Sequence, residues 1–198
     1  MLFNTKFILA SKSQSRSFIL KNNKLNFFQT KPKCDEDKIK KKFIKIKPKK
    51  LSLILAEHKA KSLNKKYKEY LVVGCDTTIE LNNKLIEKAK NLNQAKQTLN
   101  KMSGKKPIIF SSLVCVYLDK VVWKTTQKST IKVRKLTNKE IEQYLKKTKK
   151  SILSSVGCFQ IEKEGPNIIE YIRGDFFNVM GLPLFPFLKF LKRFNIKK

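Results

Sequence analysis

Two acidic segments stand out because their side chains could do chemistry. Asp76 follows an apolar run in LVVGCDTTIEL (71–81), so we expect a carboxylate at a strand end, beside a glycine. The segment CDED (34–37) adds Asp35 and Glu36. Carboxylates placed close together hold Mg²⁺ against phosphates and orient water. The plainer alternatives are an Asx turn at Asp76 and a solvated acidic turn at CDED.

A third segment, FILASKSQSRSFIL (7–20), runs from an expected strand directly into an expected helix. The first N–H groups of a helix are unpaired and favour an anion. Ser11 and Ser13 can cap the helix or donate hydrogen bonds, and Arg16 can fork onto two phosphate oxygens. The junction therefore has the chemistry of a phosphate cradle without P-loop glycines. An ordinary serine-capped helix start is the plainer alternative.

Two further polar residues are candidate ligands. Lys88, in LIEKAKN, is a point charge suited to phosphate, although any one lysine of so lysine-rich a chain is expected on the surface. Gln160, in VGCFQIE, is expected in the middle of a strand. A buried amide there must find partners or bind a ligand.

The composition narrows the class of protein. A chain of 198 residues with 41% hydrophobic content suits one domain. No apolar run approaches the roughly 20 residues of a membrane span, and we find no signal peptide, so we expect a cytoplasmic protein without a membrane partner. The four cysteines form no CxxC pair. The single histidine, His58, excludes a His-rich metal site, and because we expect it on a helix surface we expect no Ser-His-Asp triad.

The net charge of +30 raises the alternative of a nucleic-acid-binding protein. Only four of the 45 basic residues are arginine, and the lysines are spread along the whole chain. Proteins that read bases rely on arginine, and single-strand binders interleave exposed aromatic residues with the charge. We therefore expect no specific nucleic-acid partner, only weak, salt-sensitive attraction to polyanions.

Hydrophobic periodicity predicts alternating strands and helices. The order is strand 6–10, helix 14–22, strand 25–30, a polar loop over about 31–50, helix 51–66, a strand from 71 with a hairpin turn at Asn82-Asn83, helix 92–102, paired strands 108–118 and 120–136, a helix with a capping box at Thr137 and Glu140, a strand-rich stretch over 154–175, and a closing helix. Helices alternating with antiparallel hairpins indicate an α/β fold with a mixed sheet.

Taken in order, these segments resemble the Maf family of nucleoside triphosphate pyrophosphatases over essentially the whole length. The matching motifs are LASKSQSRSFIL (9–20), Asp35-Glu36, LAEHKA (55–60), VVGCDT (72–77), IEKAK (86–90), SGK (103–105), VGCFQIE (156–162) and VMGLPL (179–184). The stretches SSVGCFQIE and IRGDFFNVMGLPL look most like Maf-like proteins of alphaproteobacteria.

The resemblance implies one domain over residues 1–198 with the inosine triphosphate pyrophosphatase-like fold, an elongated mixed sheet whose two lobes flank a cleft. It also implies a cytosolic hydrolase that cleaves a nucleoside triphosphate, including modified or non-canonical ones, to the monophosphate and pyrophosphate. Such enzymes need a divalent cation, Mg²⁺ or Mn²⁺. A homodimer is possible by analogy alone.

The resemblance also assigns roles by position. Ser11, Ser13 and Arg16 would hold the phosphates or shape the turn around them, and Gln160 would lie against the nucleotide. Glu36 and Asp76 would hold the metal, and Asp76 would accept a proton from the attacking water. Lys88 would neutralise charge on the phosphates. A metal, fixed cations and a carboxylate together suit attack at the α phosphorus.

The chain departs from the family pattern at the cradle. The family has proline and arginine where this chain has Gln14 and Ser15. Loss of a bidentate arginine removes stabilisation of the transition state unless another cation, such as Lys12, replaces it. The alternative is therefore a catalytically weakened Maf-like protein that binds nucleotides or regulates cell division. The sequence leaves the preferred base open, between pyrimidine and 7-methylguanine triphosphates.

Overall fold

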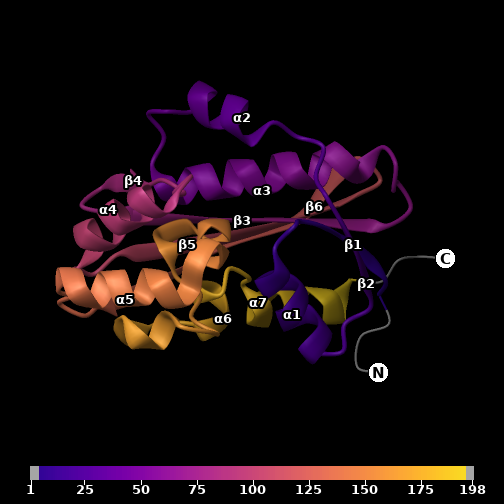
Figure 1. The fold of residues 1–198 in the computed structure, drawn as a ribbon. Coiled ribbons are helices and arrows are strands. Elements are labelled where there is room, and N and C mark those ends of the chain that lie inside the picture. The colour runs from indigo at the N-terminus through magenta and orange to yellow at the C-terminus, as the bar shows by residue number, and fades with distance from the viewer. Residues whose placement is uncertain (1–4, 195–198) are drawn as a thin grey trace.

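The computed structural model describes residues 5–194, which form one seven-stranded mixed sheet (Figure 1). The strand order is β2-β1-β3-β5-β6-β7, and β4 pairs with β3 off this path. This arrangement confirms the expected α/β fold. The strands are β1 (Phe7–Ala10), β2 (Phe27–Thr30), β3 (Leu71–Leu81), β4 (Lys84–Ile86), β5 (Ile108–Tyr117), β6 (Lys120–Val133) and β7 (Ile169–Arg173).

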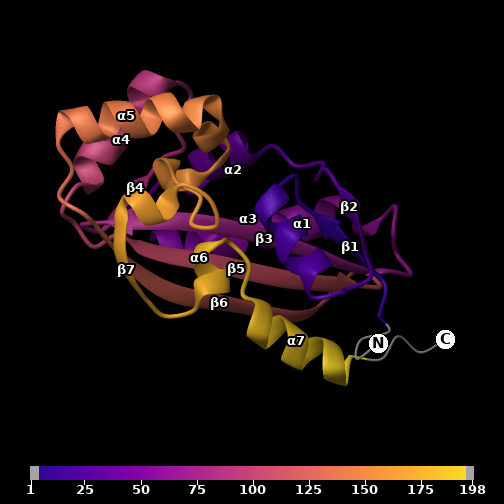
Figure 2. The same cartoon turned by 60° about the horizontal axis from the view of Figure 1, so that its bottom comes forward.

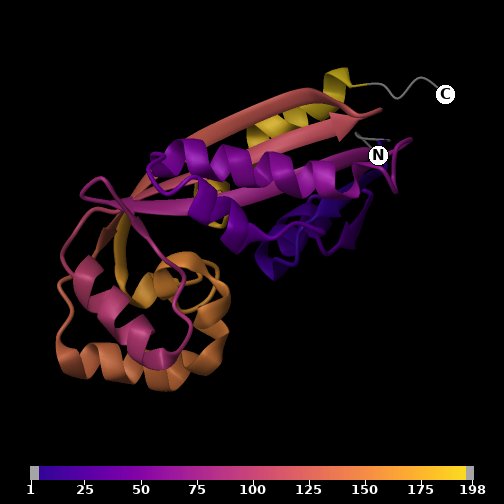
Figure 3. The same cartoon turned by 90° about the horizontal axis from the view of Figure 1, so that it is seen from above.

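Helices cover both faces of the sheet, as the turned views show (Figures 2 and 3). Helix α3 packs on one face, over a small core that includes Ala56, Ala60 and Val72. A larger core fills the other face, where α1 and α7 lie. The helices are α1 (Gln14–Asn22), α2 (Glu36–Lys42), α3 (Pro48–Asn64), α4 (Leu92–Met102), α5 (Asn138–Thr148), α6 (Phe176–Val179) and α7 (Leu184–Arg193).

The molecule has two lobes, which Figure 3 shows from above. One lobe holds β1, β2, α1, α3 and α7. The other holds α4, α5 and the irregular segment that follows α5, at the far end of the long strands. A cleft of about 1020 Å³ is lined from one side by residues 11–16 and from the other by residues 150–151 and 154–156 with 159–163. The predicted cleft is therefore present. The predicted domain, 1–198, also includes residues 1–4 and 195–198, which lie outside the described residues.

Several predicted local signals are confirmed. Asn82 and Asn83 take the positive φ angles, 51° and 60°, that a tight hairpin turn needs. Thr137 and Glu140 form both hydrogen bonds of the capping box that begins α5. Helix α4 spans the predicted residues, and Gly104 follows it with φ of 68°.

Two predictions of secondary structure are wrong. Residues 31–50 are not one loop, because they contain α2 and the first turn of α3. Asp35 caps the start of α2. The first turn of the helix is acidic and the last turn carries three lysines, and this distribution of charge complements the helix dipole. Residues 154–168 are not strand-rich. They are irregular, with 3₁₀ turns at Val156–Cys158 and Gly165–Asn167, and positive φ at Gly157 and Cys158 interrupts the extended run that was expected there.

Among residues 5–194, we find no helix with the length and apolar character needed to cross a bilayer. The cytoplasmic location stays a prediction.

Candidate active site

The candidate site lies where the parallel pairing of β1 with β3 ends. Ala10, the last residue of β1, pairs with Gly74, and β3 then continues for seven more residues. Asp76 is therefore in the middle of β3 and not at a strand end as predicted. Its side chain is 7% exposed, and it lines the cleft just beyond the point where the neighbouring strand stops. In open α/β sheets, ligands bind at the carboxyl ends of parallel strands.

A buried lysine joins the two candidate carboxylates. The Lys59 ammonium lies 2.5 Å from Asp76 Oδ1 and 3.0 Å from Glu36 Oε2, and the Lys59 residue is only 6% exposed. Burial alone would lower the pKa of this ammonium, but the Asp76 carboxylate, with Glu36, raises it above its usual 10.5. Lys59 therefore stays charged and holds the two carboxylates together.

Sequence reasoning missed Lys59, although a signal was present. Leu51, Leu55, Lys59 and Leu63 recur at every fourth position on the buried face of α3. A lysine in an apolar stripe needs a buried partner, because an unpaired buried charge is costly. The next buried carboxylate along the chain is Asp76.

The start of α1 forms a second part of the site. Ser13 caps the helix by accepting from Arg16 N at 3.3 Å, and the Ser13 N–H donates to Ser11 Oγ at 3.2 Å. Arg16 is buried, and four of its five N–H groups bind protein acceptors: Gly181 O, Cys75 O, Ser11 Oγ and Thr77 Oγ1. One N–H is left, so the predicted fork onto two phosphate oxygens is not available in this arrangement.

The remaining predicted residues, Lys88 and Gln160, both line the cleft. Lys88 is exposed at the cleft, yet partial desolvation lowers the pKa of its ammonium below the usual 10.5, although the Glu36 carboxylate opposes this. Gln160 lies in an irregular segment and not in a strand, which corrects the predicted setting. All seven predicted site residues thus face one cleft.

Sequence reasoning also missed Glu162, which is the hydrogen-bond partner of Ser15. The Ser15 hydroxyl donates to Glu162 Oε1 at 2.5 Å, which joins the two walls of the cleft. No pattern in the sequence links these residues, which are 147 positions apart. Lys12 lines the cleft beside Ser15 and is exposed.

The carboxylates of the cleft are the groups that could hold a divalent cation. Asp76 and Glu36 already share one cation, Lys59. Within the described part of the chain, no three His, Cys, Asp or Glu side chains are grouped as metal ligands. Mg²⁺ suits such a sparse site because it keeps several waters and takes other oxygens from substrate phosphates.

The chain is similar to known proteins over almost its whole length. Residues 6–194 match the family model described as "Maf-like protein". The chain is 38% identical to the 7-methyl-GTP pyrophosphatase of Bartonella henselae over 189 residues, 96% of each chain. It is 35% identical to the nucleoside triphosphate pyrophosphatase of Pelagibacter ubique over 189 residues, 94% of this chain and 97% of that protein.

A third relative, the nucleoside triphosphate pyrophosphatase of Maricaulis maris, is 34% identical over 188 residues, 95% of this chain and 96% of that protein. The match to the family model and these identities confirm the resemblance that the ordered motifs indicated. The chain belongs to the Maf family.

Proposed function

We propose that this protein hydrolyses a nucleoside triphosphate to the nucleoside monophosphate and pyrophosphate. The observation that carries the proposal is the charge cluster of Asp76, Glu36 and Lys59, held at the end of the β1–β3 pairing beside the start of α1. Carboxylates, fixed cations and a hydroxyl-rich helix start face one cleft. The names of the curated relatives support the same reaction.

The residues divide the work as follows. A water attacks the α phosphorus, the bond from that phosphorus to the bridging oxygen breaks, and pyrophosphate leaves with the electron pair. Asp76 accepts the water's proton, and Lys59 holds Asp76 in position. Lys88 and Lys12 offset the charge that builds on the phosphate oxygens. Gln160 faces the nucleotide from the other wall.

We infer that Asp76 and Glu36 bind Mg²⁺ or Mn²⁺ when substrate is present. A bound divalent cation would supply further charge neutralisation at the phosphates. The ligand set on the protein side is small, so substrate oxygens and water would complete it.

The test is pyrophosphate release from canonical and modified nucleoside triphosphates, with Mg²⁺, with Mn²⁺ and with chelator. The panel includes 7-methyl-GTP, UTP, CTP and dTTP, so the preferred base is read from the same experiment. We expect metal-dependent release, and we expect Asp76→Asn to lower it by about a hundredfold or more. Release that survives chelator, or survives Asp76→Asn, would contradict the assignment of these residues.

The second candidate is a nucleotide-binding protein with weakened catalysis. Its support is the Ser15–Glu162 hydrogen bond, which stands where the family has an arginine. It predicts nucleotide binding, measured by calorimetry, without release of pyrophosphate from any substrate. Under this candidate Ser15→Arg would restore release, whereas under the leading proposal the unaltered chain is already active.

A further inference from the structure

A line of polar side chains runs from the candidate site into the sheet: Thr77 is partly buried and lines the cleft, and Ser111 is fully buried. Arg16 Nη2 lies 3.1 Å from Thr77 Oγ1, and Thr77 Oγ1 lies 2.9 Å from Ser111 Oγ. Ser111 Oγ lies 2.9 Å from the carbonyl oxygen of Asn178. Thr77 and Ser111 are paired residues of β3 and β5.

The direction of this line is fixed by the number of protons. Ser111 has one hydroxyl proton and donates it to Asn178 O, which only accepts. The hydrogen bond between the two hydroxyls must then be donated by Thr77. Thr77 in turn accepts from Arg16, so every donor from Arg16 to Asn178 points the same way.

The far end of the line anchors a wall of the cleft. Asn178 is fully buried, and its Nδ2 donates to Ser129 Oγ at 2.8 Å. Ser129 donates to Asp175 O at 3.1 Å. Residues 174–181 are therefore tied to the sheet by polar contacts, and the end of this segment, Val179–Gly181, lines the cleft.

The near end of the line reaches the cradle. Arg16 donates to Gly181 O at 2.8 Å through Nε and to Ser11 Oγ at 3.1 Å through Nη1. Ser11 Oγ also accepts from Ser13 N, so both of its lone pairs are used. Its own proton is left to donate, and Ser11 lines the cleft.

We propose that Thr77, Ser111 and Asn178 are positioning residues, which hold Arg16 so that it orients the Ser11 hydroxyl toward a phosphate oxygen. Arg16 then positions protein groups and does not bind the phosphates itself. Lys12 and Lys88 contact the phosphates. The proposal rests on the proposed function, because it assigns roles within that site.

The first test is Ser111→Ala, whose residue is fully buried and cannot touch a substrate. We expect kcat for pyrophosphate release to fall on the order of tenfold to a hundredfold, because a misplaced binding group costs that much. KM should change less, because the lysines that attract the nucleotide are untouched. The matched control is Ser52→Ala, an equally buried hydroxyl on the α3 face that bonds to Ser112. It should keep the kcat of the unaltered protein.

The second test separates the hydroxyl of Thr77 from its bulk. Thr77→Val should lower kcat as Ser111→Ala does, because it removes the hydroxyl. Thr77→Ser keeps the hydroxyl and should have the kcat of the unaltered protein. The control is Thr126→Val, which removes an equivalent threonine hydroxyl, bonded to Ser112 at 2.7 Å. A normal kcat in Ser111→Ala, or equal losses in Thr77→Ser and Thr77→Val, would overturn the proposal.

A third readout needs no substrate. The amides of Gly181 and Leu182 donate within the anchored segment, to Asn178 O and Phe177 O. Their hydrogen exchange should speed up in Ser111→Ala and not in Ser52→Ala. If the unaltered protein releases no pyrophosphate, the proposed function fails while this measurement still tests the anchoring. If exchange does not respond, the positioning proposal fails by itself.

Discussion

One buried ammonium group, that of Lys59, forms ion pairs with two carboxylates of the candidate site. Its contacts with Asp76 and Glu36 differ from the surface ion pairs of this chain, because both Lys59 and Asp76 are nearly inaccessible to water. Exposed pairs contribute little to stability, whereas removal of one partner from a buried pair leaves an uncompensated charge. The site's geometry and part of the fold's stability therefore depend on the same side chain.

We expect Lys59→Met to lower the free energy of unfolding by about 3–5 kcal/mol near neutral pH. Mg²⁺ should recover part of that loss, because a divalent cation can take the place of the ammonium between the carboxylates. Denaturant unfolding with and without Mg²⁺ measures both effects. The control is Lys61→Met, whose exposed pair with Glu57 contributes about 0.5 kcal/mol or less. Equal losses in the two variants would contradict this view of Lys59.

Lys88 sets the expected alkaline limit of activity. Its folded pKa lies below 10.5, so it loses its charge at a lower pH than Lys59, whose pKa lies above 10.5. Pyrophosphate release should fall as pH rises through the pKa of Lys88. Lys88→Arg keeps its charge at higher pH, so the alkaline limb should move upward. A limb that stays in place in Lys88→Arg would assign it to another group.

Linkage gives the sign of the matching stability effect. The folded state holds the Lys88 proton less tightly than the unfolded state does. The charged lysine therefore lowers the free energy of unfolding at pH values below its folded pKa. That cost is relieved as pH rises from the folded pKa toward 10.5. The effect of Lys59 has the opposite sign. Its stabilising contribution to the free energy of unfolding is complete below pH 10.5 and is lost as the pH rises through its raised pKa.

At the scale of elements, the close contact between α3 and β3 sets the position of Lys59. A Cβ on Gly74 would overlap the carbonyl oxygen of Ala56 and approach the backbone nitrogen of Ala60. Only glycine allows the helix backbone to lie this near the strand. Lys59 comes directly before Ala60, and it reaches Asp76 because of this close approach.

We expect Gly74→Ala to destabilise the fold by about 1–3 kcal/mol, because overpacking pushes α3 away from β3. Pyrophosphate release should fall by more than the loss of folded protein explains, since Lys59 moves with the helix. Thermal unfolding and activity, measured on the same sample, separate the two effects. Activity that simply follows the folded fraction would show that the separation of α3 and β3 does not affect the site.

The sequence predicted the elements that carry strong local signals. Periodicity and caps identified α1, α4 and α5, and the paired asparagines identified the β3–β4 turn. The setting of Asp76 was not predictable, because it depends on where β1 stops beside β3, some 60 residues away in the chain. The 3₁₀ turns after α5 were also missed, because positive φ at Cys158 has no composition signal.

The site itself was predicted more completely than its contacts. Family motifs identified seven residues that do share a cleft. They did not reveal that Arg16 is saturated by protein acceptors, or that Ser15 meets Glu162, because both facts depend on partners far along the chain. Lys59 was also missed, but it differs from these cases because its place in the apolar stripe of α3 was a local signal of burial.

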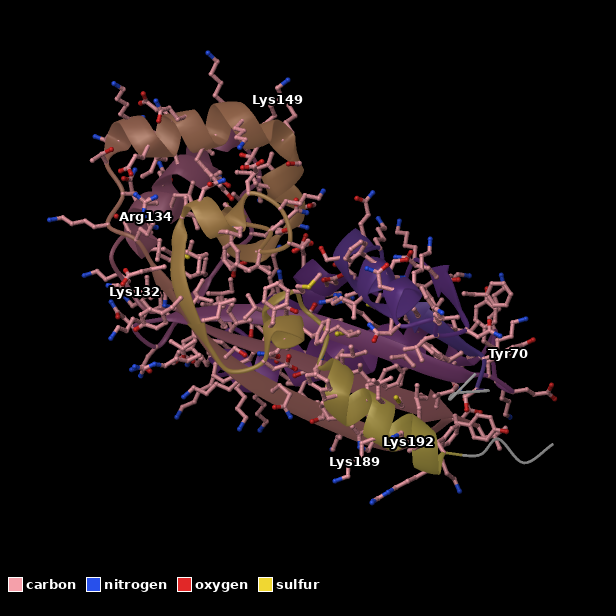
Figure 4. All side chains as sticks on the ribbon, turned by 90° about the horizontal axis from the view of Figure 1, so that it is seen from below. Tyr70, Lys132, Arg134, Lys149, Lys189 and Lys192 are labelled. Atoms are coloured by element: carbon pink, nitrogen blue, oxygen red, sulfur yellow. The ribbon has the colours of Figure 1, made fainter. Side chains whose placement is uncertain are left out.

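At the scale of the whole molecule, positive charge is spread over the surface. Figure 4 shows Lys132, Arg134 and Lys149 on one lobe and Lys189 and Lys192 on α7. A net charge of +30 also makes the folded chain repel itself.

We expect the melting temperature to rise by several degrees as NaCl increases from about 0.02 M to about 0.3 M, because salt screens this repulsion. Weak binding to single-stranded DNA should disappear over the same range. Differential scanning fluorimetry and fluorescence anisotropy measure the two responses. A melting temperature that falls with salt would mean that attractive ion pairs outweigh repulsion. DNA binding that persists at about 0.2 M would revive the nucleic-acid alternative.

The hydrogen bond from Arg16 to Gly181 also bears on how the protein is made. These residues are 165 positions apart, so the cradle at the start of α1 is completed by a segment that is synthesised much later. During translation, Arg16 leaves the ribosome early and lacks its Gly181 partner while the strands β3, β5 and β6 are synthesised. A nascent chain therefore acquires its complete nucleotide site only after Gly181 has been synthesised. Truncation before Gly181 should give chains that contain every predicted catalytic residue and yet have no complete site.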